Sequence, residues 1–165
     1  MIFFYKYLGI LLIPFIKLNV IKRVIKGKEI KNRFKERYGI TYQKKPQRDV
    51  IWIHAASIGE FKSADLIINS HFKKYSILVT TTTVSAANYA LKHYGDKIIH
   101  QFAPLDVIFW VEKFLSYWNP KLVIWIESDL WPITTKLIKQ KKIKAILLNV
   151  RMSPQSFNKW KKFKF

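Results

Sequence analysis

The sequence predicts an α/β fold of the Rossmann type, an open and mostly parallel sheet preceded by an N-terminal membrane-anchor helix. Three observations predict it. Short runs rich in Ile, Val and Leu recur from residue 49 onward, without the strict alternation of half-exposed strands. Helical stretches separate these runs, which is the order of elements in parallel α/β folds. A strongly apolar segment with a basic flank opens the chain.

The predicted elements follow one another in a regular order. We expect strands at 50–54, 76–81, 97–102, 122–126 and 145–150. We expect helices at 59–72, 85–93, 106–118 and 132–141, and Pro132 suits the first turn of the last one. Because crossover helices pack on both sides of a parallel sheet, each strand should be covered on both faces.

The first 28 residues are predicted to attach the chain to a membrane. Residues 2–20 are apolar, although Lys6, Pro14 and Lys17 interrupt them. The longest charge-free run, residues 7–16, would span about 15 Å as a helix, roughly half of a bilayer core. A basic cluster at 22–28 follows instead of a signal-peptide cleavage site, and such clusters stay on the cytoplasmic side. A spanning helix and an interfacial helix both remain open.

The net charge of +20 is concentrated at the two ends of the chain. Residues 1–48 contain thirteen Lys or Arg against two acids, and residues 155–165 add four lysines and no acid. This distribution favours an anionic membrane surface or a phosphorylated lipid as partner. A codon bias toward lysine is an alternative for the composition, but it does not explain the clustering. No nucleic-acid partner is expected, because the charge lies beside the apolar segment rather than along a helix or a sheet face.

The residue types present exclude several kinds of site. The chain has no cysteine, which excludes disulfides, thiolate metal sites and cysteine nucleophiles. Its four histidines form neither an H-E-x-x-H motif nor a cluster, so no metal site is expected.

Acidic residues follow three of the predicted strands. Ligands of open parallel sheets bind outside the carboxyl ends of the strands, where the connecting loops share one rim. Those loops contain Glu60, Asp106, and Glu127 with Asp129. Charged residues gathered at that edge, beside strands that stay apolar, indicate a binding or catalytic site.

Five residues of these loops are candidates for a structural or a functional role. Glu60 begins a predicted helix, where it either stabilises the helix dipole or accepts a proton. Ser57 is a helix N-cap or a hydroxyl ligand, because it does not lie in a G-x-S-x-G nucleophile elbow. Thr82 belongs to a run of four threonines that suits a strand end as well as a substrate contact. Arg151 is a candidate for an anion contact, and His54, which ends a buried strand, is expected to be structural.

Five sequence blocks occur in order along the chain. They are W-I-H-A-A-S-I-G-E at 52–60, the threonines at 80–83, P-L-D at 104–106, E-S-D-L-W-P at 127–132 and N-V-R-M-S at 149–153. The shorter block E-R-Y-G at 36–39 precedes them. Together these blocks resemble the 3-deoxy-D-manno-octulosonic acid (Kdo) transferases of lipopolysaccharide synthesis. Any single block is weak evidence, but five in order are specific.

The resemblance implies the N-terminal lobe of a GT-B glycosyltransferase at the cytoplasmic face of the inner membrane. Such enzymes transfer Kdo from CMP-Kdo to a hydroxyl of a lipid A precursor, lipid IVA, without a metal or cofactor. The resemblance implies that Glu60 is the general base and that Glu127 stabilises the transition state. The acceptor-binding residues that it implies are Ser57, Thr82, Asp129 and Arg151.

The resemblance covers only the N-terminal half of the family. It divides the chain into an anchor (1–28), a basic connecting segment (29–48), a Rossmann-like acceptor lobe (49–153) and a basic tail (154–165). The lobe that supplies most CMP-Kdo contacts is missing, so we expect a truncated chain or one part of a split enzyme with a separately encoded C-terminal donor lobe. The isolated chain should then be inactive, because catalysis requires donor and acceptor to be held together. The alternative function is a catalytically inactive, membrane-bound remnant of the enzyme.

Overall fold

The computed structural model describes residues 2–71, 73–126 and 130–149 of the chain. Its strands are β1 (Val50–His54), β2 (Ser76–Thr81), β3 (Ile99–Phe102), β4 (Leu122–Ile126) and β5 (Lys144–Leu148). Its α-helices are α1 (Ile2–Leu11), α2 (Ile13–Ile25), α3 (Ile58–His71), α4 (Val84–Tyr94), α5 (Ile108–Trp118) and α6 (Pro132–Gln140). Two short 3₁₀ helices, η1 (Phe34–Tyr38) and η2 (Gly95–Lys97), complete the described elements.

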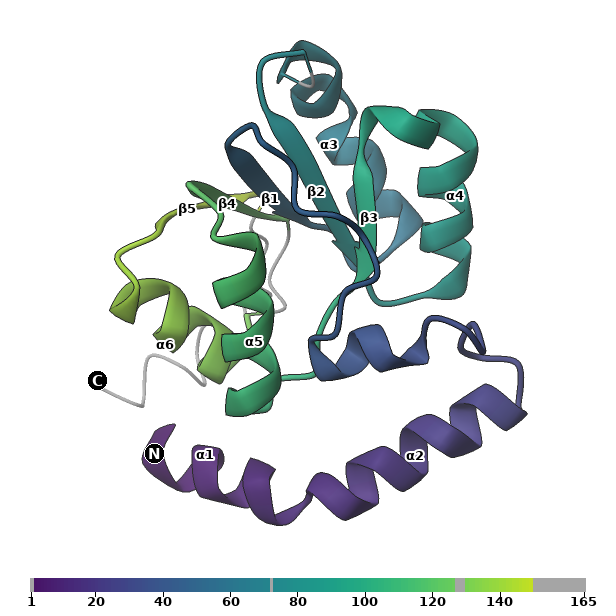
Figure 1. The fold of residues 1–165 in the computed structure, drawn as a ribbon, viewed down its shortest axis with the longest axis vertical. Helices are drawn as coiled ribbons and strands as arrows, with labels where there is room; N and C mark the ends of the chain where they lie inside the picture. Colours follow the sequence, from purple (N-terminus) through teal and green to yellow (C-terminus); the bar gives the residue numbers. More distant parts are fainter. Residues whose placement is uncertain (1, 72, 127–129, 150–165) are drawn as a thin grey trace.

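The five strands form one parallel sheet in the order β3-β2-β1-β4-β5 (Figure 1). In the centre of the sheet, Ile53 of β1 lies between Val79 of β2 and Ile124 of β4. This strand order is that of the Rossmann fold, so the predicted fold class of the lobe is confirmed.

The predicted strand boundaries agree closely with the structure. β1, β2 and β4 occupy the residues predicted for them. β3 begins at Ile99 rather than at residue 97, because Gly95–Lys97 form η2. β5 begins one residue earlier than predicted and ends at Leu148, and residue 150 lies outside the described residues.

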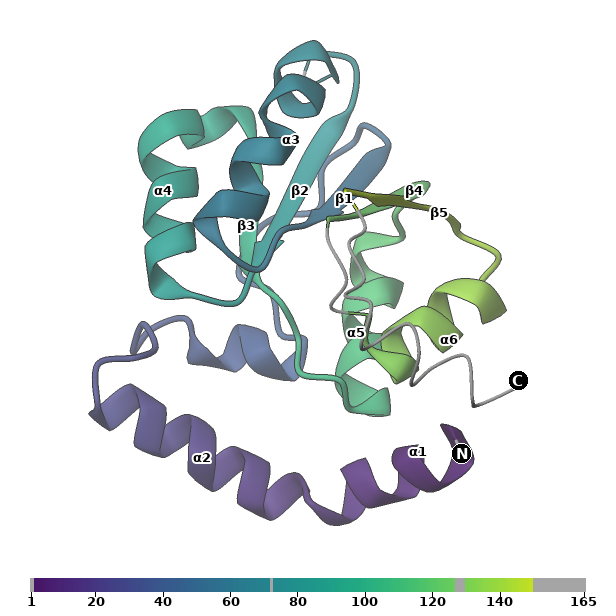
Figure 2. The same cartoon turned by 180° about the vertical axis from the view of Figure 1, so that it is seen from behind.

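Helices cover both faces of the sheet, with α3 and α4 on one side and α5 and α6 on the other (Figures 1 and 2). The core under α3 and α4 is mainly aliphatic and includes Phe61 and Tyr94. The core under α5 and α6 is richer in aromatic side chains, among them Trp52, Phe114 and Trp118. The alternating side chains of β1 therefore enter two separate cores, as expected of a strand with a continuous apolar sequence.

β5 departs from the prediction that every strand is covered on both faces. Its residues from Lys144 to Leu147 are exposed, and Leu148 is half-buried. β5 is the last strand of the sheet order, and it pairs with β4 on one side only within the described residues. The other edge strand, β3, is buried, with α4 and η1 packed against it. The edge position alone therefore does not expose β5, and its exposure means that the described helices leave its side chains uncovered.

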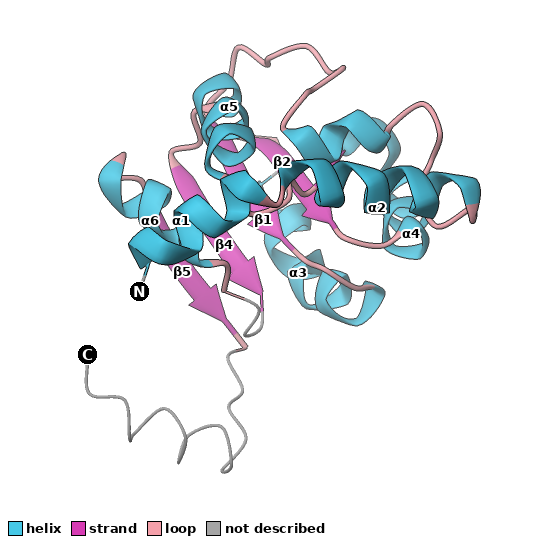
Figure 3. Ribbon diagram, turned by 90° about the horizontal axis from the view of Figure 1, so that it is seen from below, coloured by secondary structure: helices cyan, strands magenta, loops and turns pink. Residues whose placement is uncertain are grey.

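The two N-terminal helices lie across the edge at which the strands end (Figures 1 and 3). Leu12 separates α1 from α2, and Pro14 occupies the first turn of α2, where a missing backbone N–H costs no helical hydrogen bond. α1 contacts both α5 and α6. Among the described residues, none of the helices combines the length and the apolar character needed to cross a bilayer.

Gly39 lies where the segment after α2 packs against the lobe. Its φ of 68° is left-handed, and it ends η1. A Cβ at this position would run into the carbonyl oxygen of Trp110 in α5. Both the backbone conformation and the close approach therefore require glycine.

Candidate active site

The candidate site lies at the point where the strand order of the sheet reverses. β1 is followed by α3 on one face, whereas its neighbour β4 is followed by α6 on the other face. The connections after these two strands diverge, and they leave the crevice in which open α/β sheets bind their ligands. Glu60 is in the connection after β1, and the block at 127–132 follows β4.

Ser57 and Glu60 both bind backbone N–H groups at the start of α3. The Ser57 hydroxyl accepts the backbone N–H of Glu60 at 3.3 Å, and Glu60 Oε2 accepts the backbone N–H of Ala56 at 2.7 Å. The spacing S-x-x-E at 57–60 is that of a capping box, but here the glutamate binds the N–H that precedes the N-cap residue. The carboxylate is half-buried and held in one orientation at the carboxyl end of β1. The N-cap role predicted for Ser57 is therefore observed.

Thr82 joins the Glu60 loop to the rest of the rim. Its backbone N–H and its hydroxyl both donate to the carbonyl oxygen of Ala56, at 3.3 and 2.9 Å. Its own carbonyl oxygen accepts Arg37 Nη2 at 2.6 Å. A continuous set of hydrogen bonds thus runs from Glu60 through Ala56 and Thr82 to Arg37.

Arg37 is held by a buried ion pair with Glu29. Arg37 Nη2 lies 3.1 Å from Glu29 Oε1, and Arg37 Nε lies 3.2 Å from Glu29 Oε2. Arg23 of α2 donates to the same carboxylate at 2.8 Å. Burial lowers the pKa of the Arg37 guanidinium, and the Glu29 carboxylate opposes that shift. The two arginines therefore share one acid, which joins α2 to the rim.

A second ion pair fixes β3. Glu36 accepts both Arg33 Nε at 2.7 Å and Arg33 Nη2 at 2.9 Å, and it also accepts the backbone N–H of Phe102 at 2.6 Å. Arg33 Nη2 lies 2.9 Å from His100 Nδ1, and His100 Nε2 lies 3.0 Å from the Thr81 hydroxyl. Because a guanidinium only donates, Nδ1 of His100 accepts and its proton is on Nε2.

Both buried histidines are neutral. Burial lowers the pKa of His54 to about 3, and the Arg37 charge adds to the effect. Burial also lowers the pKa of His100 to about 3, with further contributions from Arg33 and Arg37. His54 Nδ1 lies 2.8 Å from the Thr80 hydroxyl, and its ring packs against Trp125 and Trp131. This packing agrees with the structural role expected for His54.

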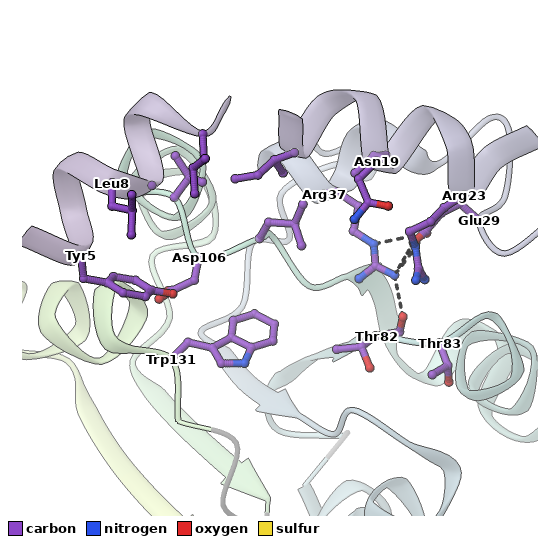
Figure 4. Close-up of a pocket in the computed structure, with 16 residues that line it drawn as sticks. Tyr5, Leu8, Asn19, Arg23, Glu29, Arg37, Thr82, Thr83, Asp106 and Trp131 are labelled. Carbon is purple, nitrogen blue, oxygen red and sulfur yellow. Dashed lines mark hydrogen bonds and ion pairs between the residues drawn. The ribbon is translucent and has the colours of Figure 1, made fainter. Parts of the chain in front are cut away.

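A pocket of about 600 Å³ separates the N-terminal helices from the rim (Figure 4). Leu8, Leu12 and Ile16 line it on the helix side. Thr82 and Trp131 line it on the side of the sheet. Ser57 and Glu60 do not line this pocket, and Thr82 is the residue that connects the two.

Asp106 is a structural acid rather than an available one. Its Oδ1 accepts the backbone N–H and the hydroxyl of Thr134, at 2.8 and 2.7 Å, and its Oδ2 accepts the N–H of Ile133 at 3.0 Å. It thereby caps α6 from another loop. Tyr5 of α1 lies beside this carboxylate (Figure 4), and partial burial together with Asp106 raises the pKa of the phenol.

The structure locates three of the six site residues that the sequence predicts. Ser57, Glu60 and Thr82 lie together at the rim, whereas Glu127, Asp129 and Arg151 lie outside the described residues. Among the described residues, no three His, Asp or Glu side chains gather in a way that could hold a metal ion. The Glu29–Arg37 pair was not predicted as part of the site. The sequence signal for Arg37 was its place in the block at 36–39.

Comparisons with known proteins assign these features to a family. Residues 32–165 match the family described as 3-deoxy-D-manno-octulosonic-acid transferase (kdotransferase). The chain is 40% identical over 163 residues to the 3-deoxy-D-manno-octulosonic acid transferase of Rickettsia bellii, covering 97% of this chain and 39% of that protein.

Two further relatives show the same partial coverage. The probable mitochondrial 3-deoxy-D-manno-octulosonic acid transferase of Arabidopsis thaliana is 37% identical, with 89% of this chain and 34% of that protein aligned. The 3-deoxy-D-manno-octulosonic acid transferase of Haemophilus influenzae is 31% identical, with 98% and 39% aligned. The chain thus spans between 34% and 39% of the length of these relatives.

Proposed function

The chain belongs to the 3-deoxy-D-manno-octulosonic acid (Kdo) transferase family, and we propose that it is the acceptor-binding lobe of an enzyme that transfers Kdo from CMP-Kdo to lipid IVA in lipopolysaccharide synthesis. One observation carries the proposal. The Glu60 carboxylate is held at the switch point of the sheet and is linked through Ala56 and Thr82 to a pocket beneath apolar helices. A carboxylate beside a site for an amphiphilic acceptor is what such a transfer requires.

In the proposed mechanism, Glu60 accepts the proton of the acceptor hydroxyl as that oxygen attacks the anomeric carbon of Kdo. The N–H of Ala56 orients Oε2 and stabilises the charged form of the carboxylate. The proton moves between a hydroxyl and a carboxylate, so the step uses no metal or cofactor. A positioned general base contributes about a hundred- to ten-thousandfold in rate.

The remaining roles rest on the family resemblance. Glu127 would stabilise positive charge at the anomeric carbon as CMP leaves. Ser57, Thr82, Asp129 and Arg151 would contact the acceptor. In the described structure the Ser57 hydroxyl accepts the N–H of Glu60, and the Thr82 hydroxyl donates to Ala56. Contacts from these two hydroxyls to an acceptor would therefore add to bonds that already shape the loop.

We place the lobe at the cytoplasmic face of the inner membrane, attached by α1 and α2 lying in the interface. Phe4 and Leu11 of α1 and Phe15 of α2 are each about 70% exposed. Lys17, Lys22 and Lys26 accompany them on α2 or at its end. Exposed apolar side chains flanked by cations are the features of an interfacial helix on anionic lipid.

The donor would be bound by the part of the family that this chain does not span. The relatives named above are more than twice as long as this chain, so a C-terminal lobe on the same or on a separate polypeptide would supply the CMP-Kdo contacts. We therefore expect no measurable Kdo transfer by the 165-residue chain alone. Turnover by the purified chain, with contaminating transferase excluded, would refute this part of the proposal.

The deciding experiment joins the chain to the C-terminal lobe of a family member and measures Kdo transfer from CMP-Kdo to lipid IVA. Glu60→Gln should lower kcat by about a hundredfold or more, because an amide is not an effective base. The matched control is Glu112→Gln on the exposed side of α5, which should leave kcat unchanged. A Glu60→Gln enzyme that keeps more than about a tenth of the rate would leave Glu60 a helix cap only. A folded hybrid without activity would favour the membrane-bound remnant.

A further inference from the structure

The N-terminal helices have a second apolar stripe, which faces the lobe instead of the solvent. The residues of α1 and α2 that line the pocket recur at intervals of three or four, which places them on one helix face. They are Tyr5, Leu8, Gly9, Leu12, Ile16, Asn19, Val20 and Arg23. Among them, Val20 is buried, whereas Leu8 and Leu12 remain 39% and 38% exposed. The stripe that faces the lobe, called the inner stripe below, is therefore packed at Val20 and open around Leu8 and Leu12.

Gly9 marks the open part of this stripe. It lies inside α1, where glycine lowers helix stability relative to alanine. Gly39 shows the usual structural reasons for a glycine, a left-handed φ and a close neighbour, whereas Gly9 has neither. A Cβ built at Gly9 would meet no atom within 4 Å outside its own helix turns. The missing side chain at Gly9 therefore leaves space in the pocket, and it meets no need for a left-handed backbone or a close contact.

The charged groups that line the pocket are already compensated. Glu29 binds both Arg37 and Arg23, and Asp106 accepts the backbone of α6. The Arg23 side chain, 40% exposed, puts a cation at the mouth. The interior therefore suits an uncharged, apolar group, and the mouth suits the anionic part of the same molecule.

We propose that this pocket receives an acyl chain of the lipid acceptor, and that Gly9 is the residue that makes room for it. The inference rests on the proposed function, because it assigns the chain to the acceptor. A chain between α1 and the rim would place its head group beside Thr82, which holds the Ala56 carbonyl next to Glu60. The pocket would therefore select an acylated acceptor over a free sugar and orient it toward the base.

The test uses photo-crosslinking in vesicles. The 165-residue chain is bound to vesicles of phosphatidylcholine and phosphatidylglycerol that contain a little diazirine-labelled stearic acid, and crosslinked residues are mapped by mass spectrometry. Wild-type protein should give crosslinks to the inner stripe, at Leu8, Leu12 and Ile16, as well as to the outward Phe4 and Leu11. Lipid IVA should compete with the inner crosslinks, whereas extra phosphatidylglycerol with the same number of acyl chains should not.

The matched variants change one stripe at a time. Gly9→Leu extends a side chain from a Cβ that meets no atom within 4 Å. It should lower the inner crosslinks by about tenfold, since losing the burial of two methylene groups changes an equilibrium by that factor. Gly9→Ala should have a smaller effect in the same direction. Phe15→Ala on the outer face should lower total vesicle binding and keep the ratio of the inner crosslinks to those at Phe4 and Leu11. Far-UV circular dichroism checks that each variant folds.

Three results would overturn the inference. They are a wild-type chain without inner crosslinks, a Gly9→Leu chain with wild-type inner crosslinks, and equal competition by lipid IVA and phosphatidylglycerol. None of these depends on CMP-Kdo or on Glu60. A failure here would therefore leave the transferase proposal standing, and an inactive Glu60 hybrid would leave this inference standing.

Discussion

The guanidinium of Arg37 and the carboxylate of Glu29 form an ion pair with side-chain exposures of 5% and 2%. The pair lies between the N-terminal helices and the threonine loop, because Glu29 also binds Arg23 of α2 and Arg37 also binds the Thr82 carbonyl. One buried contact thus links the proposed membrane-binding segment to the loop that supports Glu60.

Breaking this pair should destabilise the lobe strongly. Glu29→Gln leaves the Arg37 charge buried without its partner, and removing one member of a buried pair costs about 3–5 kcal/mol. The free energy of unfolding in urea measures the loss. The control is Asp49→Asn, which removes the exposed ion pair with Lys121 and should change the unfolding free energy little. Equal losses in the two variants would show that burial of the Glu29 pair has no energetic weight.

Gly39→Ala should be more destabilising than its backbone conformation alone explains. A left-handed residue other than glycine costs about 1–2 kcal/mol, and the Trp110 carbonyl adds a steric penalty. Gly27→Ala separates the two effects, because Gly27 has nearly the same φ, 67°, but its added Cβ would meet no atom within 4 Å. Thermal unfolding should show a larger drop in Tm for Gly39→Ala. Similar drops would mean that α5 moves away at no cost.

Acid should destabilise the fold through its buried histidines. Burial lowers the pKa of His54 and of His100 to about 3 in the folded chain, against about 6.5 when unfolded. The unfolded state then binds more protons between these values, so their stabilising contribution is complete above pH 6.5 and is lost as the pH falls toward 3. Each histidine contributes a slope of about 1.4 kcal/mol per pH unit well inside that window.

The measurement is the unfolding free energy between pH 6.5 and 5, above the range in which most carboxylates titrate. His100→Gln should reduce the slope to about half, because one of the two buried histidines is removed. His71→Gln on α3 should not change it, because that side chain is exposed. A His100→Gln chain with an unchanged slope would show that His100 is already open to protons.

Membrane binding should depend on the outward face of α1 and α2. Replacing Phe4, Leu11 and Phe15 by serine removes apolar side chains that are each about 70% exposed, and vesicle affinity should fall by about tenfold or more. Sedimentation with anionic vesicles measures it. Leu91→Ser, a half-exposed position on α4, is the control. High salt should weaken binding without abolishing it, and complete release by salt would contradict an apolar contribution.

The sheet could be predicted because its signal is local. Val50–His54 and Leu122–Ile126 are continuous apolar runs, and such runs between helices specify buried parallel strands. The position of Glu60 followed from the same logic, since the carboxyl ends of parallel strands share one rim. The N-cap position of Ser57 was also predicted, whereas the bond from the Ala56 N–H to Glu60 was not.

The features that could not be predicted depend on tertiary contacts. Glu29 and Arg37 lie in a basic run that suggests a solvated surface, and only tertiary pairing buries them. Asp106 appeared to be an available rim acid, but it caps a helix that begins 26 positions later, at Pro132. The exposure of β5 could not be predicted either, because an apolar run does not show how much of a strand the packed helices will cover.

The open edge of β5 favours self-association of the protein. Ile146 and Leu147 are 47% and 45% exposed on a strand that, within the described residues, is paired on one side only. Unpaired backbone groups beside apolar side chains are a template for another extended chain, and Lys144 is the sole charged residue in the strand to oppose stacking. At high concentration the protein should therefore self-associate through this edge unless another segment or chain covers it. The solubility of the protein then depends on the segment or chain that covers β5 as much as on the protein's own surface.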